Sequence, residues 1–225
     1  MNGEANIYAK LVSLPLFLGM NKDDLTRVVA HTKMGFTRYA DGETIAKADD
    51  DCSALHVLID GRIGVERVSV DGAYRVGEHI AAPYLVEPES LFGLSLRYKA
   101  SYTAEGSVNV LTLSKEEVLR LAEQFLIIRL NLLNHISAKA QKARRRIWLP
   151  PPTDVRGRIA AFIESHCVAP AGEKTLHIKM ARLAEEINES RLDVSRALHK
   201  LQDEGLAELR RATIIIPALE KILNA

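Results

Sequence analysis

The chain has 225 residues, of which 47% are hydrophobic and 26% charged, with 30 Lys and Arg against 29 Asp and Glu. These values are typical of a globular protein with room for one large domain or two modest ones. The sequence begins MNGEANIYAK, without the pattern of a secretory signal, and no apolar run reaches the roughly 20 residues that cross a bilayer. Cys52 and Cys167 fit no metal spacing or disulfide framework. We therefore expect a cytoplasmic protein without a membrane partner.

Catalytic motifs are missing from the sequence. It contains no Gly-rich phosphate loop, no G-x-S-x-G, no H-E-x-x-H and no local cluster of Cys and His ligands. The sequence therefore does not indicate an enzyme.

The first half of the chain alternates between apolar and polar residues, as strands do. We interpret Asp41-Gly42, Asp60-Gly61 and Asp71-Gly72 as hairpin turns, because Asp-Gly between alternating runs favours a tight turn. The stretch Leu55–Val65 alternates on both sides of the second turn, and Ser107–Ser114 alternates again. Short strands with regular turns predict an antiparallel sandwich or barrel.

From Lys115 to about Trp148 there is no Gly or Pro, which predicts one long helix. Its apolar residues form two stripes at helical spacing. The first contains Phe125, Ile128, Leu132, Ile136, Ala140, Ala143 and Ile147, and the second contains Leu119, Leu126, Leu130 and Leu133. One stripe can pack on the barrel, so the other needs a partner. We predict a homodimer through Phe125, Ile128, Leu132 and Ile136, or through the leucine stripe; a helix buried on both sides within one chain is the alternative.

The stretch Leu149–Pro152 (LPPP) ends that helix and marks a domain boundary. The pattern beyond it predicts a winged helix-turn-helix, with Asn188 in the turn because asparagine tolerates a left-handed backbone. The predicted elements are helices at 154–167, 179–187 and 190–203, a strand at 175–178 and a hairpin within 206–216.

The helix that begins at Ser190 has an apolar face and a polar face. Ser190 and Asp193 have the spacing of an N-cap and its partner. Val194, Ala197, Leu198 and Leu201 form the core side, and Arg191, Leu192, Ser195, Arg196 and His199 lie off it. Such a face suits an anionic groove, although a solvated surface gives the same pattern. From Pro150 onward, 11 basic residues balance 11 acidic ones, so nucleic acid would have to meet a local patch.

Several stretches carry a resemblance to a known family. They are LPLFLGMNKDDLTRVV, YADGETIAKADDD, LHVLIDGRIGVE and LAEEINESRLDVSRALHKLQDEGLAELRRATIII. Together they resemble the Crp/Fnr family of bacterial transcription regulators, from about Leu14 to Ile216. The resemblance implies an α+β protein: an N-terminal β jelly-roll sensor barrel of the cyclic-nucleotide-binding type, a long dimerisation helix and a C-terminal winged helix-turn-helix. We place these parts at 1–114, 115–149 and 150–225.

The resemblance also implies a homodimer that binds a pseudo-palindromic site in double-stranded DNA, with RNA polymerase as a further partner. The DNA contacts would come from the helix and the wing: Ser190, Arg191, Leu192, Ser195, Arg196, His199, Arg210 and Arg211. The family carries at the position of Leu192 a glutamate that reads a base edge. We expect Leu192 to contact a thymine methyl group instead.

The effector residues depart from the family pattern. Family members that bind cyclic nucleotides hold the ribose with Gly-Glu and the phosphate with Arg-Ser or Arg-Thr. Here Pro88 precedes Glu89, and Tyr98-Lys99 stand in place of the arginine and its hydroxyl partner, next to Arg97. These replacements argue against cyclic AMP.

Other cofactors are constrained by residue counts. Two cysteines exclude an iron–sulfur cluster of the family's type. Haem needs only one or two axial ligands, and His135 on the long helix is the candidate. The candidate effector pocket thus comprises Glu89, Arg97, Tyr98, Lys99 and His135, and the signal is an unidentified small molecule, a haem-bound gas or a redox change. A cyclic-nucleotide-dependent regulator and a signalling module that does not bind DNA are the alternatives.

Overall fold

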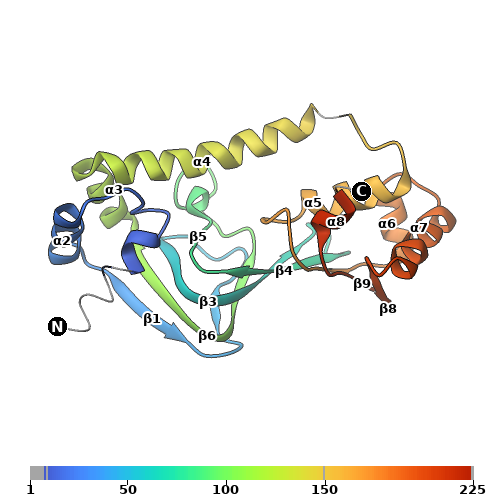
Figure 1. The fold of residues 1–225 in the computed structure, drawn as a ribbon, viewed down its shortest axis with the longest axis horizontal. Helices are drawn as coiled ribbons and strands as arrows, with labels where there is room; N and C mark the ends of the chain where they lie inside the picture. The colour runs from blue at the N-terminus through green and yellow to red at the C-terminus, as the bar shows by residue number, and fades with distance from the viewer. Residues whose placement is uncertain (1–7, 9, 149, 224–225) are drawn as a thin grey trace. The chain divides into compact units, whose positions relative to one another are not determined.

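A computed structural model describes residue 8, residues 10–148 and residues 150–223. Their contacts form two compact units (Figure 1). One contains the described residues up to Ile63 and those from Ala81 to Trp148. The other contains Gly64–Ile80 and the described residues from Pro150 onward. The second unit therefore includes a segment that lies within the domain predicted at 1–114. Leu149, at the predicted boundary, is outside the described residues.

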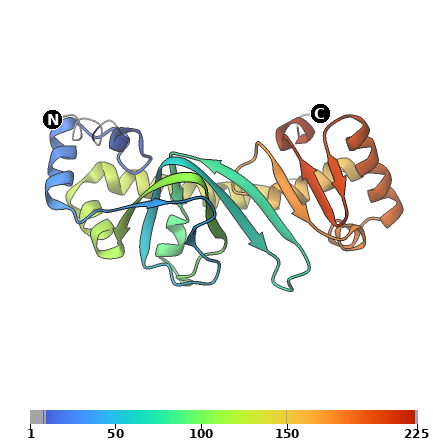
Figure 2. The same ribbon diagram turned by 90° about the horizontal axis from the view of Figure 1, so that it is seen from below.

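An antiparallel sheet forms the body of the first unit, as predicted. Strand β6 (Ser101–Ser114) pairs with β1 (Gly35–Tyr39) and β2 (Thr44–Ala46), and β3 (Ala54–Val68) pairs with β5 (Tyr84–Val86). Figure 2 shows these strands curving around an interior. Side chains at alternate positions fill that interior because successive residues of a strand point to opposite faces. Along β6 the buried residues include Tyr102, Ala104, Val108 and Val110.

Only one of the three Asp-Gly pairs forms the predicted hairpin turn. Asp71-Gly72 joins β3 to β4 (Arg75–Ala81). Asp60-Gly61 lies inside β3, a single strand of 15 residues, where Gly61 has φ of 94°. Asp41-Gly42 separates β1 from β2, which both pair with β6 and not with each other. The predictions at Asp60 and Asp41 were wrong because Asp-Gly supplies a left-handed residue, which a strand can use without reversing its direction.

The predicted long helix is two helices, α3 (Lys115–Gln124) and α4 (Leu126–Ile147). They are separated at Phe125, whose φ of −124° and ψ of 105° are extended. The Phe125 ring is buried, and the guanidinium of Arg27 on α2 (Lys22–His31) lies 5.3 Å from its centroid. We infer that burial of this ring, rather than a Gly or Pro, breaks the helix. None of the described helices is long and apolar enough to cross a membrane.

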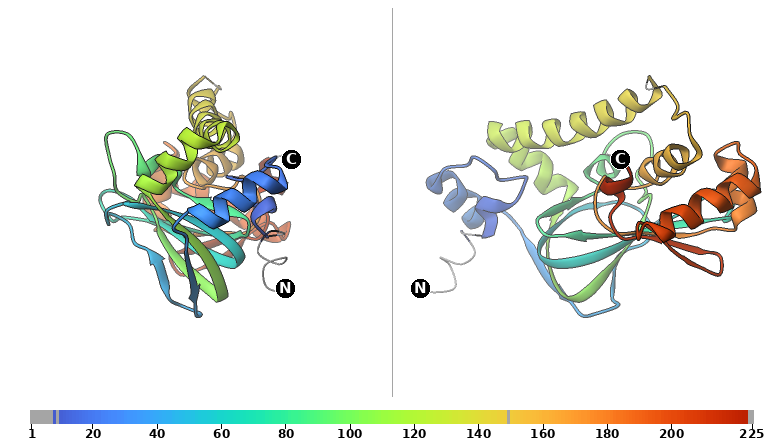
Figure 3. Two further views of the ribbon diagram at one scale, coloured as in Figure 1. Left: turned by 90° about the vertical axis from the view of Figure 1, so that its left-hand side faces the viewer. Right: turned by 45° about the vertical axis from the view of Figure 1, so that its right-hand side comes forward.

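The second unit is a winged helix-turn-helix, as predicted. Its helices are α5 (Val155–Ser165), α6 (Met180–Glu186), α7 (Arg191–Asp203) and α8 (Leu219–Leu223). Its strands follow the order β4, β7 (Lys174–His177), β9 (Thr213–Ile216) and β8 (Glu208–Arg210), all antiparallel. The right-hand view of Figure 3 shows α6 and α7 together with the β8–β9 hairpin. Helix α8 and the addition of β4 to this sheet were not predicted.

The helix-turn-helix turn has the expected backbone. Asn188 has φ of 53° and lies between α6 and α7, and Gly205 has φ of 70° just after α7. The amide of Leu206 donates to the carbonyl of Leu201, which closes the end of the helix. Local residue chemistry therefore determines where α7 begins and ends.

Replacing Gly61 by alanine should destabilise the protein more than replacing Gly42. Both glycines have positive φ, so either alanine adds about 1–2 kcal/mol of backbone strain. At Gly61 a Cβ would lie 2.7 Å from the carbonyl oxygen of Ser107, whereas at Gly42 it would meet nothing within 4 Å. We expect Gly61→Ala to lose roughly 1–3 kcal/mol more than Gly42→Ala, measured by denaturant unfolding. Equal losses for the two variants would contradict the close approach.

Candidate functional site

Helix α7 is fixed in rotation by its apolar face. The side chains of Val194, Leu198 and Leu201 are buried in the core of the second unit. At the N-terminus the Ser190 hydroxyl accepts a hydrogen bond from the amide of Asp193 at 3.1 Å and donates one to its carboxylate at 2.6 Å. These contacts order the first turn, so the opposite side of α7 is presented as a rigid surface.

The predicted readers lie on that exposed side. Arg191, Leu192, Arg196 and His199 are exposed, and Ser195 is half-buried. Leu192 is 58% exposed although it is apolar. Arg196 lies 3.6 Å from the Asp193 carboxylate, and the His199 Nδ1 bonds the Ser195 carbonyl at 2.7 Å. The structure thus brings five of the predicted residues together on one face of α7.

Of the remaining three predicted residues, Ser190 is the N-cap of α7 and the other two lie on the wing. Arg210 and Arg211 are exposed at the turn between β8 and β9, where Ala212 has φ of 53°. The Arg210 Nε bonds the Glu208 carboxylate at 2.7 Å. Glu208 therefore offsets part of the positive charge of the wing.

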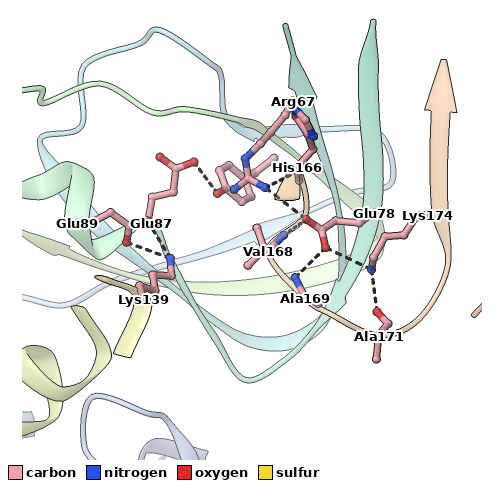
Figure 4. A network of polar contacts seen from close by, with 11 residues as sticks. Arg67, Glu78, Glu87, Glu89, Lys139, His166, Val168, Ala169, Ala171 and Lys174 are labelled. Carbon is pink, nitrogen blue, oxygen red and sulfur yellow. Dashed lines mark hydrogen bonds and ion pairs between the residues drawn. The ribbon is translucent and has the colours of Figure 1, made fainter. Parts of the chain in front are cut away.

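In the first unit, Glu89 and His135 lie close to Lys139. The Lys139 ammonium bonds both carboxylate oxygens of Glu89, at 2.9 and 3.0 Å (Figure 4). The pKa of His135 is lowered, first by burial and then by the positive charge of Lys139, while Glu89 opposes the shift. Its Nε2 is buried and has no hydrogen-bond partner among the described residues. The described part of the chain therefore leaves the hydrogen-bonding capacity of this buried nitrogen unused.

The other three predicted effector residues do not converge on His135. Arg97 is exposed and binds the carbonyl of Asp49 and the carboxylate of Asp51. The Lys99 ammonium bonds the Ser95 hydroxyl at 2.8 Å. Tyr98 is 4% exposed and its hydroxyl donates to the carbonyl of Ala54. The residues at the expected phosphate position are therefore occupied by contacts within the chain.

The sequence analysis missed the most buried carboxylate of this region, Glu87. It accepts hydrogen bonds from the Ser90 hydroxyl, the Lys99 amide and the Tyr102 hydroxyl, at 2.8 to 2.9 Å. Its backbone is left-handed, with φ of 36°, just before the short 3-10 helix η1 (Pro88–Leu91). In the sequence VEPES, two glutamates stand two residues apart, and no local signal tells which of them points inward. Glu87 is buried and Glu89 is exposed.

The described residues provide no obvious metal or redox centre. They contain no group of three or more His, Cys, Asp or Glu side chains that could hold a metal ion. Burial raises the pKa of the Cys52 thiol, and the nearby Tyr98 hydroxyl only partly offsets this. A thiol with a raised pKa remains protonated and reacts slowly with oxidants.

The first part of one predicted dimer stripe is buried within the chain itself. Phe125, Ile128 and Leu132 are buried and Ile136 is half-buried. Of the two predicted dimer surfaces, the one through Phe125, Ile128 and Leu132 is therefore corrected, because side chains packed in their own core cannot contact a second copy. The leucine stripe is exposed at 43–58%: Leu119, Leu126, Leu130 and Leu133.

Comparison with known proteins agrees with this organisation. A model of the cyclic nucleotide-binding domain matches residues 36–125, and a model of the Crp-like helix-turn-helix domain matches residues 157–224. The cyclic AMP receptor protein of Thermus thermophilus is 26% identical over 205 residues, which cover 89% of this chain and 91% of that protein. This chain belongs to the Crp/Fnr family.

Solved structures support the same fold. The catabolite activator protein of Thermus thermophilus aligns with a TM-score of 0.54 at 23% identity and covers 93% of this chain and 98% of its own. A Crp/Fnr family regulator from Eubacterium rectale aligns with a TM-score of 0.53 at 18% identity and covers 94% and 99%. The chain is a DNA-binding transcription regulator of the Crp/Fnr family, with a cyclic-nucleotide-binding type of domain before its helix-turn-helix.

Proposed function

We propose that the protein is a homodimeric, sequence-specific regulator that inserts α7 into the major groove of DNA. The observation that carries this proposal is the single exposed face of α7, which combines two arginines with a leucine on a helix fixed by its core side. Arginine can bond both acceptors of a guanine edge, and an apolar side chain can contact the thymine methyl group. Two copies of α7 would read half-sites about one turn, roughly 10 base pairs, apart.

Because the charge of the C-terminal part is balanced, DNA would have to be bound by a local patch of this part. Its 11 basic and 11 acidic residues from Pro150 onward give no net attraction to phosphate. We expect Ser195, Arg210 and Arg211 to contact the DNA backbone and to set the register, while Arg191 and Arg196 reach bases. His199 is exposed on the same face, one turn beyond Ser195.

The exposed leucine stripe supports dimerisation through α3 and α4. Four leucines at helical spacing leave an apolar surface on the first unit, and a second copy of the same helix is the occupant we infer. A two-fold dimer also explains why a pseudo-palindromic site would be bound.

We infer that the effector is not a cyclic nucleotide held in the family manner. One relative is named a cyclic AMP receptor protein. In this chain, however, Tyr98 is buried at the expected phosphate position, Glu89 pairs with Lys139, and Glu87 bonds its own neighbours. The half-buried His135 supports a small effector or haem in its place. The raised pKa of the Cys52 thiol disfavours a redox signal at that cysteine.

The remaining expectations follow from this role. A transcription regulator acts in the cytoplasm and needs no catalytic activity, and no enzymatic constellation was found in the sequence. RNA polymerase is its further partner if it activates transcription.

Replacing Arg196 should weaken operator binding and relax its sequence preference. Arg196→Ala removes a bidentate donor, so we expect a loss of about 1–3 kcal/mol with operator DNA and a smaller loss with random DNA. Arg196→Lys keeps the positive charge but loses the planar guanidinium that bonds both acceptors of a base. It should recover only the part of the binding free energy that comes from attraction to phosphate. The control is Lys221→Ala on α8, which also removes one exposed positive charge. Unchanged affinity of Arg196→Ala for both DNAs would refute the assignment of α7.

Leu192 should impose an A·T pair at one position of each half-site. An exposed leucine cannot exchange hydrogen bonds with a base, but it can contact the thymine methyl group. Selection of binding sites from random DNA should return A·T there, and Leu192→Glu should shift the selection toward a cytosine, whose N4 donates to a carboxylate. Recovery of G·C with the natural protein, or no shift with Leu192→Glu, would show that the leucine makes no base contact.

A charge in the leucine stripe should produce monomers. Leu133 is 53% exposed, so Leu133→Glu can fold, but it would place two carboxylates in the apolar interface at a cost of several kcal/mol. Sedimentation at micromolar concentration should show a dimer for the natural protein and a monomer for Leu133→Glu. Leu94→Glu, at a fully exposed leucine of the first unit, is the control and should remain dimeric. A natural protein that sediments as a monomer would contradict the proposal.

A further inference from the structure

We call the first unit the sensor unit and the second the DNA-binding unit. The hairpin formed by the end of β3 and by β4 is part of the core of the DNA-binding unit. Four residues of β4, Arg75–Glu78, pair antiparallel with β7. Val76 is 3% exposed and belongs to the same hydrophobic cluster as the buried residues of α7. The Tyr74 ring packs on Phe162 and His166, and its hydroxyl bonds the His166 Nε2 at 3.0 Å. The unit is therefore built from two segments that are more than 60 residues apart in the sequence.

Glu78 anchors this hairpin. Its carboxylate is almost fully buried and accepts hydrogen bonds from the amides of Val168 and Ala169 (Figure 4). The same carboxylate lies 3.4 Å from Arg67 and 3.4 Å from the ammonium of Lys174, which is fully buried. Removal of the hairpin would leave Lys174 as a buried charge without its counter-ion, which is strongly unfavourable. We infer that the hairpin remains docked whenever the unit is folded.

The tip of the hairpin contacts the helix-turn-helix directly. The Asp71 carboxylate lies 2.9 Å from the guanidinium of Arg182 on α6. Arg182 also pairs with Glu186 of the same helix at 2.6 Å. Since α6 packs against α7 in the helix-turn-helix, a contact that orients α6 also orients the recognition helix.

We propose that the hairpin of residues 64–80 is a positioning element for the recognition helix, anchored by Glu78 and aligned through the Asp71–Arg182 contact. Strand β3 begins in the sensor unit and ends in the DNA-binding unit, so displacement of this strand would reach α6 and α7 through the hairpin. This inference rests on the proposed DNA binding, and it identifies residues outside the helix-turn-helix that control operator affinity.

A disulfide across β4 and β7 tests whether the docked state binds DNA. Gly77 pairs with Thr175, and a Cβ at Gly77 would lie 3.9 Å from the Thr175 Cβ, within disulfide range. In a Cys167→Ser background, Gly77→Cys with Thr175→Cys should form an intrachain disulfide. Its oxidised and reduced forms should bind operator within about twofold of each other. Failure to form the bond in folded protein, or loss of operator binding on oxidation that reduction restores, would overturn the proposal.

Removing the charge of Asp71 at the tip of the hairpin tests whether the hairpin positions α6 and α7, separately from its contribution to folding. Asp71→Asn keeps the turn hydrogen bonds of this side chain but removes the charge that faces Arg182. The matched control is Glu66→Gln, which removes one charge from an exposed pair with Arg75 inside the hairpin. We expect Asp71→Asn to bind operator about threefold to fivefold more weakly than Glu66→Gln, the upper part of what an exposed ion pair contributes, with equal unfolding midpoints and equal random-DNA affinities for the two variants.

Equal operator affinities for the two variants would overturn the positioning role. If instead the natural protein shows no preference for operator over random DNA, the proposed function itself fails. The two failures are therefore distinguishable.

Discussion

A carboxylate can be buried in a protein only where hydrogen-bond donors surround it, and each unit of this protein is organised around one such group. In the DNA-binding unit, Glu78 accepts hydrogen bonds from two backbone amides and forms ion pairs with an arginine and a buried lysine. In the sensor unit, Glu87 accepts hydrogen bonds from a serine hydroxyl, a tyrosine hydroxyl and a backbone amide. Glu78 joins segments 90 and 91 residues apart, and Glu87 joins η1 to residues 12 and 15 positions further along the chain. Both therefore fix contacts that the preferences of neighbouring residues leave open.

The two carboxylates have different consequences for function. Glu87 uses its hydrogen-bonding capacity within the chain, next to the buried Tyr98 and Tyr102. Strand β4, which carries Glu78, lies in sequence within the predicted sensor domain, but it pairs with β7 in the sheet of the DNA-binding unit. Glu87 supports the proposal that the effector is not a cyclic nucleotide, and Glu78 supports the proposal that the hairpin of residues 64–80 positions the recognition helix.

The recognition helix shows how a stable core and a reading surface are combined. Val194, Leu198 and Leu201 are buried to within 1% of full burial, so the rotation of α7 is set by packing. Its opposite side is then free to carry residues that contribute little to stability. This separation explains why Leu192 can remain exposed without weakening the fold, and why the choice of residues on that side can follow DNA sequence.

Features that depend on neighbouring residues could be predicted from the amino-acid order alone. Asn188, Ser190 and Gly205 fix the turn, the start and the end of α7 through local backbone chemistry, and the alternation of Ser107–Ser114 fixes a strand. The family resemblance followed from the same local patterns. They also predicted the exposed face of α7, because helical spacing alone separates its two sides.

Only the tertiary structure decided the features that depend on distant contacts. It continued β3 through Asp60-Gly61, where the close approach of Ser107 favours glycine without a turn, and it broke the long helix at Phe125 to bury that ring. It placed Glu87 rather than Glu89 in the interior. It also decided between the two apolar stripes, burying Phe125, Ile128 and Leu132 and leaving the leucine stripe exposed. It placed residues 64–80 in the DNA-binding unit, because the partners of Glu78 lie about 90 residues further along the chain. No pattern within a short window carries that information, since burial is a property of the whole fold.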